Sequence, residues 1–293
     1  MKKQISVVEA VQEFWDSKPC GSDTSQAAAL SPEYFREVEA FRYQLEPHIL
    51  DVVPFAAFRN KQVLEIGCGL GTDGARFAAA GADYQAVDLT PQALHFAKAN
   101  FTSRGLHGKF TQINAEQLPF SDATFDLVYS HGVIHHIPQT ERVVSEMYRV
   151  LKPGGKAIVM VYHRHSFNYY VNILFVRRLG ALLLLLPGGP AIAAKLTGEK
   201  REIMDSHRQR FRDRGFSYLS TKEFLSANTD GPGNPLSKVY SRSEALELFR
   251  QFHNVKTEIH YLNRRRLPLI GHWLPQNFDR RWGWHLYIEA LKQ

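Results

Sequence analysis

Short apolar runs alternate with amphipathic segments between residues 61 and 163. The apolar runs predict strands at 62–67, 84–89, 109–114, 125–130 and 156–163. The segments between them have helical spacing at 72–81, 91–101 and 142–151, and the second begins with a proline in its first turn. Strands that alternate with helices in this way predict a parallel, doubly wound sheet.

The end of the chain follows a different pattern. A helix is predicted at 241–252, where Ser241 and Glu244 have the spacing of a capping box. Two β-rich runs, 255–262 and 284–290, follow without a helix between them. Such strands should pair antiparallel, so we expect an α/β sheet that is parallel except for its last strand.

Three further regions surround this core. Helical patterns at 7–16 and 33–50 predict an N-terminal helical lid over residues 1–50. The core would then comprise residues 51–163 and 241–293, with residues 164–240 inserted after the fifth strand as a substrate or cap region.

Composition narrows the class of protein. A chain of 293 residues can bury a substantial core. Its two cysteines, Cys20 and Cys68, are too few for a disulfide framework, so we expect a reducing, cytoplasmic location. The N-terminus lacks the apolar stretch of a signal peptide, and the longest apolar run, Leu179 to Leu186, is far shorter than the ~20 residues of a membrane span.

The net charge of +7 arises partly from local clusters. Basic residues crowd positions 200–214 and again 264–266. Such patches can bind nucleic acid, anionic lipid or an acidic substrate, or can simply form a solvated face. No nucleic-acid-binding module accompanies them, so we expect no nucleic-acid partner.

A glycine-rich loop, E-I-G-C-G-L-G (65–71), follows the first predicted strand. Two spacings overlap in it. Gly67, Gly69 and Gly71 give G-x-G-x-G, while Gly69, Gly71 and Gly74 give the G-x-G-x-x-G spacing of dinucleotide-binding proteins. The loop alone therefore leaves a nicotinamide-dependent oxidoreductase open.

The ends of the next strands add further candidates. Asp88 ends the second strand, where a carboxylate can accept two hydrogen bonds from a ribose diol. The third ends at N-A-E-Q-L-P-F (114–120), in which Asn114 and Glu116 could meet an adenine edge and Ala115 could offer backbone contacts. The fourth ends at S-H-G-V-I-H-H-I-P (130–138).

Taken with V-D-L-T (87–90) and L-K-P-G-G-K (151–156), these motifs resemble those of class I S-adenosylmethionine-dependent methyltransferases of the small-molecule, type 11 kind. The resemblance implies a Rossmann-like, seven-stranded sheet and S-adenosylmethionine as cofactor. It implies that the methionine part is held by Glu65 and the loop of Gly67, Cys68, Gly69 and Gly71, although Cys68 could equally be a small filler. It also implies that Asp88 holds the ribose and that Leu89, Ala115 and Glu116 frame the adenine. One departure is Asn114, where relatives most often have Asp, so this position brings no charge.

Such a cofactor carries an electrophilic methyl group, so a base is needed only if the acceptor must lose a proton. The candidate catalytic groups are His131, which also lies next to the cofactor, and Tyr162 and His163 at the end of the fifth strand. One of the latter pair could instead pack in the sheet, because neighbours on a strand face opposite ways.

Candidate contacts to the acceptor come from the lid, the fourth strand end and the insertion: Trp15, His135, His136, Tyr169, Asp230 and Asn234. The H-x-x-x-H-H spacing could suggest a metal, but no cysteine or clear carboxylate partner accompanies it, so no metal is expected. The apolar stretch 166–187 could wall an acceptor pocket, contact a membrane or lipid surface, or pack upon itself.

We therefore expect methyl transfer to an oxygen, carbon, sulfur or nitrogen atom of a small, possibly lipophilic or anionic molecule, by in-line displacement that releases S-adenosylhomocysteine. The alternatives are an NAD(P)-dependent oxidoreductase and a catalytically silent partner subunit that only binds the cofactor. The oligomeric state stays open.

Overall fold

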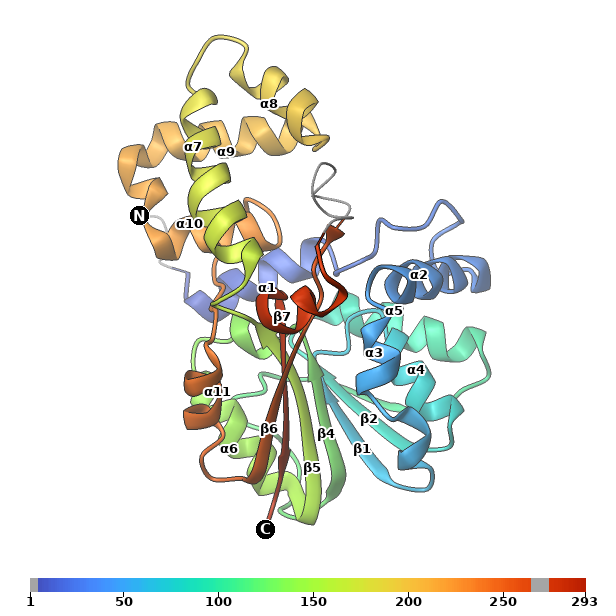
Figure 1. Ribbon diagram of the computed structural model, residues 1–293. Helices are drawn as coiled ribbons and strands as arrows, with labels where there is room; N and C mark the ends of the chain where they lie inside the picture. The colour runs from blue at the N-terminus through green and yellow to red at the C-terminus, as the bar shows by residue number, and fades with distance from the viewer. Residues whose placement is uncertain (1–4, 265–273) are drawn as a thin grey trace.

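Seven strands form one mixed sheet in the computed structural model, which describes residues 5–264 and 274–293. Their order is β3-β2-β1-β4-β5-β7-β6, and β7 runs antiparallel to both β5 and β6 (Figure 1). The strands are β1 (Gln62–Ile66), β2 (Asp83–Asp88), β3 (Lys109–Gln112), β4 (Phe125–His131), β5 (Leu151–Tyr162), β6 (His253–His260) and β7 (His285–Leu291). The expected parallel sheet with an antiparallel last strand is confirmed.

The sheet buries both of its faces, because successive side chains of its central strands point to opposite sides. On β4, for example, Val128 packs in the same apolar cluster as α6 and α11. Its neighbours Leu127 and Tyr129 pack on the other face with α3, α4 and α5.

The helices of the core and the N-terminal segment mostly follow the predicted order. They are α1 (Val7–Ser17), α2 (Pro32–Leu45), α3 (His48–Val52), η1 (Phe55–Phe58), α4 (Thr72–Ala79), α5 (Pro91–Ser103), η2 (Ile134–His136), α6 (Thr140–Val150), α11 (Arg242–Leu248), η6 (Gln276–Phe278) and α12 (Asp279–Trp282). Ser241 and Glu244 form the expected capping box at the start of α11.

Several boundaries differ from the sequence prediction, and two of them are instructive. The helix expected at 33–50 is divided into α2 and α3, because Pro47 cannot donate the backbone hydrogen bond that would continue the helix. The fifth strand begins at Leu151 rather than 156, since the K-P-G-G turn region stays extended and Leu151 pairs with Phe125 across a register shift.

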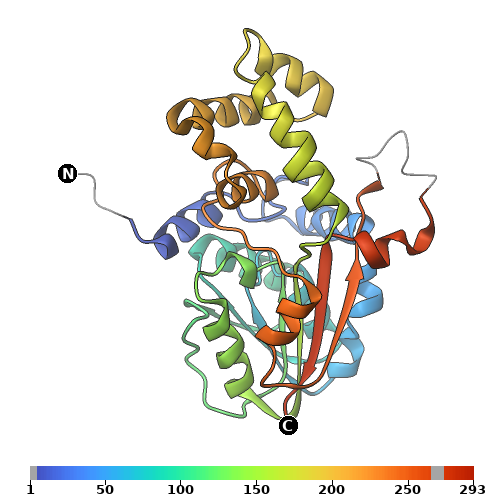
Figure 2. The same cartoon turned by 60° about the vertical axis from the view of Figure 1, so that its left-hand side comes forward.

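Residues 164–240 form a helical cap above the carboxyl ends of the strands (Figures 1 and 2). Its elements are η3 (Asn168–Arg177, a π-helical segment), α7 (Arg178–Leu183), α8 (Gly189–Thr197), α9 (Arg201–Arg214), η4 (Gly215–Leu219) and α10 (Thr221–Thr229). Its own apolar cluster includes Phe211 and Phe224 and reaches the sheet at Tyr162 and Trp284.

The helix α1 lies between the cap and the core (Figure 2). Its Asp16 accepts a hydrogen bond from the backbone N–H of Gln92 at the start of α5. Its Phe14 lies under Gly233 of the cap, where an added Cβ would come within 3.0 Å of the ring. This placement suits the proposed lid.

Among the helices of the described residues, none is both long enough and apolar enough to span a membrane. Of the basic cluster at 264–266, the last two residues lie outside the described residues.

Candidate active site

A cavity of about 320 Å³ lies where the carboxyl ends of the parallel strands meet the N-terminal helices and the cap. This is the position at which open α/β sheets bind their ligands. Of the residues expected in the site, those that line the cavity are Trp15, Glu65, Gly67, Cys68, Gly69, Asp88, Leu89, Asn114, Ala115, His131, His136, Tyr162 and Asp230. The structure thus brings most of the candidates together.

The glycine loop joins β1 to α4 through positive backbone angles. Gly67 has φ +77°, and an added Cβ would lie 2.3 Å from the side chain of Val133. Gly69 has φ +51° with open space where a Cβ would point. Glycine is the residue that adopts such angles without strain, so the loop backbone can approach a ligand closely at Gly69.

Gly74 separates the two overlapping spacings of this loop. It lies outside the cavity lining. An added Cβ there would come within 2.2 Å of the Tyr84 hydroxyl and 2.9 Å of Glu65 Oε2. Gly74 therefore lets α4 pack closely on β1 and β2, while Gly67 and Gly69 face the cavity. Gly71 is also outside the lining and packs against Ala97.

Asp88 at the end of β2 is held in place by its neighbours. Its Oδ1 accepts hydrogen bonds from the backbone N–H (3.0 Å) and hydroxyl (2.9 Å) of Thr90, and its Oδ2 accepts one from the N–H of Gly69 (3.2 Å). Burial raises the pKa of this carboxyl above its ordinary value, although these hydrogen bonds oppose the rise. The result is a fixed acceptor at the rim of the glycine loop.

Glu65 on β1 is a buried acid that accepts a hydrogen bond from the Tyr84 hydroxyl. Burial and the nearby Asp73 carboxylate raise the pKa of Glu65 well above its ordinary value. A cation in the cavity beside Glu65 would reverse this shift, because an opposite charge favours the ionised form.

At the end of β3, only some of the residues expected to contact adenine face the cavity. Asn114 and Ala115 line it. Glu116 does not, because its carboxylate accepts hydrogen bonds from the backbone N–H of Gln139 (2.9 Å) and the amide of Asn114 (3.3 Å). Its contact to adenine stays a prediction.

A largely buried ion pair lines the cavity beside the glycine loop and Glu65. Arg42 of α2 donates two hydrogen bonds to Asp73 of α4, at 2.9 and 2.6 Å, and the hydroxyls of Tyr43 and Tyr129 each donate one at 2.8 Å. Burial alone would raise the pKa of Asp73, but Arg42 and these hydrogen bonds outweigh it and hold the pKa well below its ordinary value. Asp73 thus stays ionised and orients Arg42.

His131 lies against this ion pair at the end of β4. Its Nδ1 accepts from Arg42 Nη2 (3.2 Å), so in the neutral ring Nε2 carries the proton and donates to the Tyr287 hydroxyl (2.9 Å). Burial and the Arg42 charge lower the pKa of His131 well below its ordinary value. With both ring nitrogens engaged, its catalytic role stays a prediction and the geometry does not favour it as a base.

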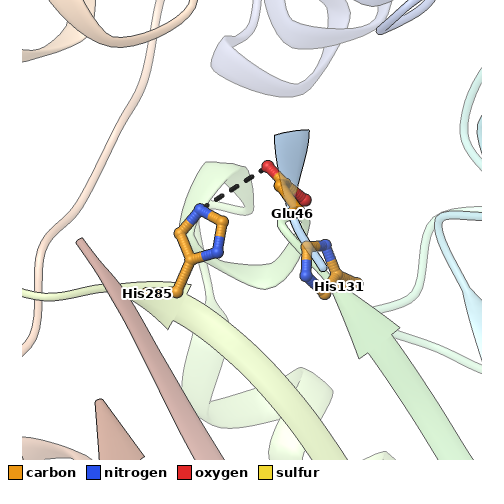
Figure 3. A group of neighbouring side chains, drawn as sticks. All are labelled: Glu46, His131 and His285. Carbon is orange, nitrogen blue, oxygen red and sulfur yellow. Dashed lines mark ion pairs between the residues drawn. The ribbon is translucent and has the colours of Figure 1, made fainter. Parts of the chain in front are cut away.

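Glu46, His131 and His285 all line the cavity, and Figure 3 shows their side chains close together. One ligand atom from each lies within 4.8 Å of the others, and His285 Nε2 is 3.8 Å from Glu46 Oε1. Arg42 argues against a metal here, because its guanidinium contacts His131 and lies 3.8 Å from Glu46. The absence of a metal remains a prediction. We interpret the three side chains as a polar part of the cavity lining.

The cap side of the cavity holds a second polar group. His136 Nδ1 donates to the carbonyl of Leu236 (2.7 Å), and Nε2 has no hydrogen-bond partner among the described residues although the side chain is buried. That nitrogen lies 3.4 Å from Asp230 Oδ2, while Asp230 Oδ1 accepts from the Tyr162 hydroxyl (2.8 Å). Trp15 packs edge-on to His136.

Besides Gly71 and Glu116, four candidates for catalysis or acceptor binding lie outside the cavity lining. His163 faces away from Tyr162 and donates from Nδ1 to the Gly283 carbonyl (3.0 Å), as the alternation of a strand requires. His135 is fully buried against Tyr162, and neither ring nitrogen has a partner among the described residues. Tyr169 packs in the cap core. Asn234 shapes the loop, since its amide contacts Asp230 and Ser237. Direct roles for these four stay predictions.

Sequence reasoning missed Arg42, Glu46, Asp73 and His285. Arg42 and Glu46 have the i, i+4 spacing of an ordinary surface ion pair, and Asp73 is an acid in the first turn of a helix. Their partners lie far along the chain, so no local motif marks them.

Residues 64–159 match the profile of a methyltransferase domain. A sterol 4-C-methyltransferase of Caenorhabditis elegans is 32% identical over 126 residues, which are 42% of this chain and 37% of the relative. A ubiquinone biosynthesis O-methyltransferase of Aromatoleum aromaticum is 29% identical over 202 residues, 68% of this chain and 80% of the relative. The chain spans only 30–39% of the length of three curated relatives. The substrates of those proteins are therefore not assigned to this chain.

Solved structures share the fold over nearly the whole chain. Geranyl diphosphate C-methyltransferase from Streptomyces coelicolor, in complex with Mg²⁺, geranyl diphosphate and S-adenosyl-L-homocysteine, matches 99% of both chains with a TM-score of 0.56 at 13% identity. A protein of Pyrococcus horikoshii matches 96% of this chain and 99% of its own with a TM-score of 0.52 at 19% identity. Residues 64–159 are thus similar in sequence to a methyltransferase domain, and the chain as a whole shares the fold of these solved structures.

Proposed function

We propose that this chain transfers a methyl group from S-adenosylmethionine to a small, largely apolar acceptor that carries an O–H or N–H group, and releases S-adenosylhomocysteine. The observation that carries the proposal is a single cavity. It joins the glycine loop and Asp88 to the unpartnered Nε2 of His136 beneath the lid and the cap. Two free cysteines fit a cytoplasmic location.

The residues present fit the cofactor. The open Cβ direction at Gly69 allows close approach, Asp88 offers a carboxylate for a ribose diol, and Glu65 offers one for an ammonium group. When bound, S-adenosylmethionine supplies an electrophilic methyl group, so the chain need only position the acceptor, exclude water and receive a proton.

We assign His136 as the general base that accepts the proton of the acceptor. Because Nδ1 donates to a carbonyl, Nε2 presents a lone pair in the neutral ring, and Asp230 Oδ2 presents another 3.4 Å away. An O–H or N–H of the acceptor that donates to Nε2 would give this nitrogen the donor that it lacks, and Asp230 Oδ2 would stay close enough to stabilise a positive charge on the ring. As the acceptor's nucleophilic atom attacks, its proton passes to His136 Nε2, and the Asp230 carboxylate stabilises the imidazolium.

The apolar part of the cavity supports a lipophilic acceptor. Among the apolar residues that line the cavity, the lid contributes Val8, Val11 and Leu45, and the core contributes Met160 and Ile137. These side chains offer no hydrogen-bond donors or acceptors, so they suit the hydrocarbon part of an acceptor.

The binding test compares S-adenosylhomocysteine with NADH by isothermal titration calorimetry. The proposal expects binding of S-adenosylhomocysteine and none of NADH. Binding of NADH alone would indicate the oxidoreductase alternative.

The transfer test incubates the protein with methyl-labelled S-adenosylmethionine and a panel of apolar phenols, quinols and amines. The proposal expects labelled product from at least one class. Tight cofactor binding without transfer to any class would instead favour a silent partner subunit.

The base is tested with His136→Gln on an acceptor that the wild-type protein methylates. We expect turnover to fall about 100-fold, because positioned general bases contribute on that scale, while cofactor affinity stays unchanged. A more acidic phenol, already ionised at neutral pH, should lose far less. His163→Gln is the matched control, since His163 directly follows β5 and lies outside the cavity lining. Equal losses for both phenols would remove His136 as the base.

A further inference from the structure

The helical run through η3 and α7 is apolar on two sides. Its inner side, with Ile173 and Ala181, is buried in the cap core. Its outer side continues onto α8 and is exposed. We call this the apolar cap face, formed by Phe175 (62% exposed), Leu179 (53%), Leu182 (43%), Leu186 (56%), Ile192 (56%) and Leu196 (74%).

A helix that is apolar all round is normally covered on all sides. Here the described residues cover only the inner side, so several large apolar side chains of η3, α7 and α8 are exposed to water. Patches of this kind on a folded protein mark a binding surface.

Both views place the turn between α7 and α8 at the end of the cap farthest from the sheet (Figures 1 and 2). The apolar cap face therefore lies on a projecting part of the molecule. A flat surface could reach it without meeting the core.

The cap that carries this face has a positive net charge. Residues 164–240 contain twelve Lys and Arg against six Asp and Glu, a net charge of +6 out of +7 for the whole chain. Helix α9, which packs against α8, carries the exposed Arg212. Lys195 in α8 and Lys200 at the start of α9 are also exposed, and none of these three cations forms an ion pair with another of the described residues.

We propose that the apolar cap face rests on an anionic lipid bilayer, with its leucines in the headgroup region and the flanking cations on lipid phosphates. An apolar face combined with nearby Lys and Arg is the pattern of interfacial helices. A second copy of the chain is the weaker occupant, because two caps of net charge +6 would repel each other. The proposal does not depend on methyl transfer.

The test is co-sedimentation of the full chain with vesicles. Vesicles of equimolar phosphatidylcholine and phosphatidylglycerol should bind the protein, and phosphatidylcholine alone should bind it much less. Leu196→Glu should lower the partition coefficient about tenfold or more, since it places a charge in the contact. Lys195→Gln should lower it about fivefold on anionic vesicles only.

Matched controls are Leu246→Glu on α11 and Lys98→Gln on α5. Leu246 is 44% exposed, about as much as Leu182, but lies away from the cap, and Lys98 is likewise exposed. Both should bind vesicles like the wild type, and all variants should keep the circular dichroism of the wild type. Equal binding of Leu196→Glu and Leu246→Glu would overturn the proposal. So would a stable dimer in analytical ultracentrifugation that Leu196→Glu dissociates.

Discussion

The cofactor end of the cavity and the side-chain network beside it take their polar groups from different parts of the chain. At the cofactor end, Asp88 is fixed by Thr90 and by Gly69, all within 21 residues of the sequence. In the side-chain network, Arg42 meets Asp73 31 residues away and His131 89 residues away, and His48 contacts His285 across 237 residues. The cofactor end is built by the backbone of consecutive strand ends, and the network by side chains from separate elements.

This difference predicts different consequences of mutation. Where backbone geometry positions a carboxylate, loss of the carboxylate should weaken ligand binding and leave folding nearly intact. Where a side-chain network joins α2, α4 and β4, loss of one member leaves its partners buried without compensation, so folding should suffer as well.

The largest effect is expected for Asp73→Asn. The variant removes the charge that balances Arg42, whose side chain is only 27% exposed, and weakens the acceptor of two tyrosine hydroxyls. We expect a loss of about 3–5 kcal/mol in the free energy of unfolding, measured by guanidinium denaturation. In the wild type the pKa of Asp73 is depressed, so this stabilisation is present above the ordinary pKa of 3.8 and is lost as pH falls below it.

The exposed Asp83 on β2 provides the matched control. It accepts a single side-chain hydrogen bond from Gln62, and Asp83→Asn should cost less than about 0.5 kcal/mol. A second variant, Asp73→Leu with Arg42→Met, should regain part of the loss, because it removes both buried charges. A cost for Asp73→Asn as small as that of the control would show that the network does not support the fold.

The sequence predicts the cofactor end well for the same physical reason. Each strand is a contiguous apolar run, and its last residue must lie at the common edge of the sheet, so Glu65, Asp88 and Ala115 could be placed from their positions alone. Alternation along β5 also required that only one of Tyr162 and His163 face the cavity, but not which one. The cap gave a weaker signal, because its helices are apolar on more than one side.

The side-chain network could not be predicted, since its contacts depend on where α2 lies relative to the sheet. The break at Pro47 sets where α2 ends, and this places Glu46 and His48 beside His285. The helical periodicity of the sequence predicted α2 and its exposed charges. It carried no information about which residue of β7 would contact the end of this helix. Likewise, nothing in the sequence indicates that Glu116 turns toward Gln139.

A smaller effect, on binding rather than folding, is expected for Asp88→Ala. Its hydrogen bonds to a ribose would each be charge-assisted, so we expect affinity for S-adenosylhomocysteine to fall about 30- to 100-fold in calorimetric titration. The melting temperature without ligand should change little. Glu116→Ala is the informative comparison, because Glu116 lies outside the cavity. If Glu116→Ala weakened binding as much as Asp88→Ala, the adenine contact implied by the family resemblance would need ligand-induced movement of this loop.

The smallest effect is a pH dependence at Glu65. Burial and Asp73 raise the pKa of this carboxyl in the free protein, whereas a bound ammonium group requires it to be ionised. Affinity for S-adenosylhomocysteine should therefore rise with pH, by at most about tenfold per unit, until the pH passes this raised pKa. Titrations in buffers of different ionisation enthalpy should show proton release below that pH.

Two variants test this assignment. Glu65→Gln should abolish both the pH dependence of affinity and the proton release. In Tyr84→Phe, the carboxylate loses a hydrogen bond that lowers its pKa, so the rise should move to higher pH. A pH-independent wild type would mean that Glu65 does not pair with the ammonium. The cofactor end would then depend on backbone geometry and Asp88 alone.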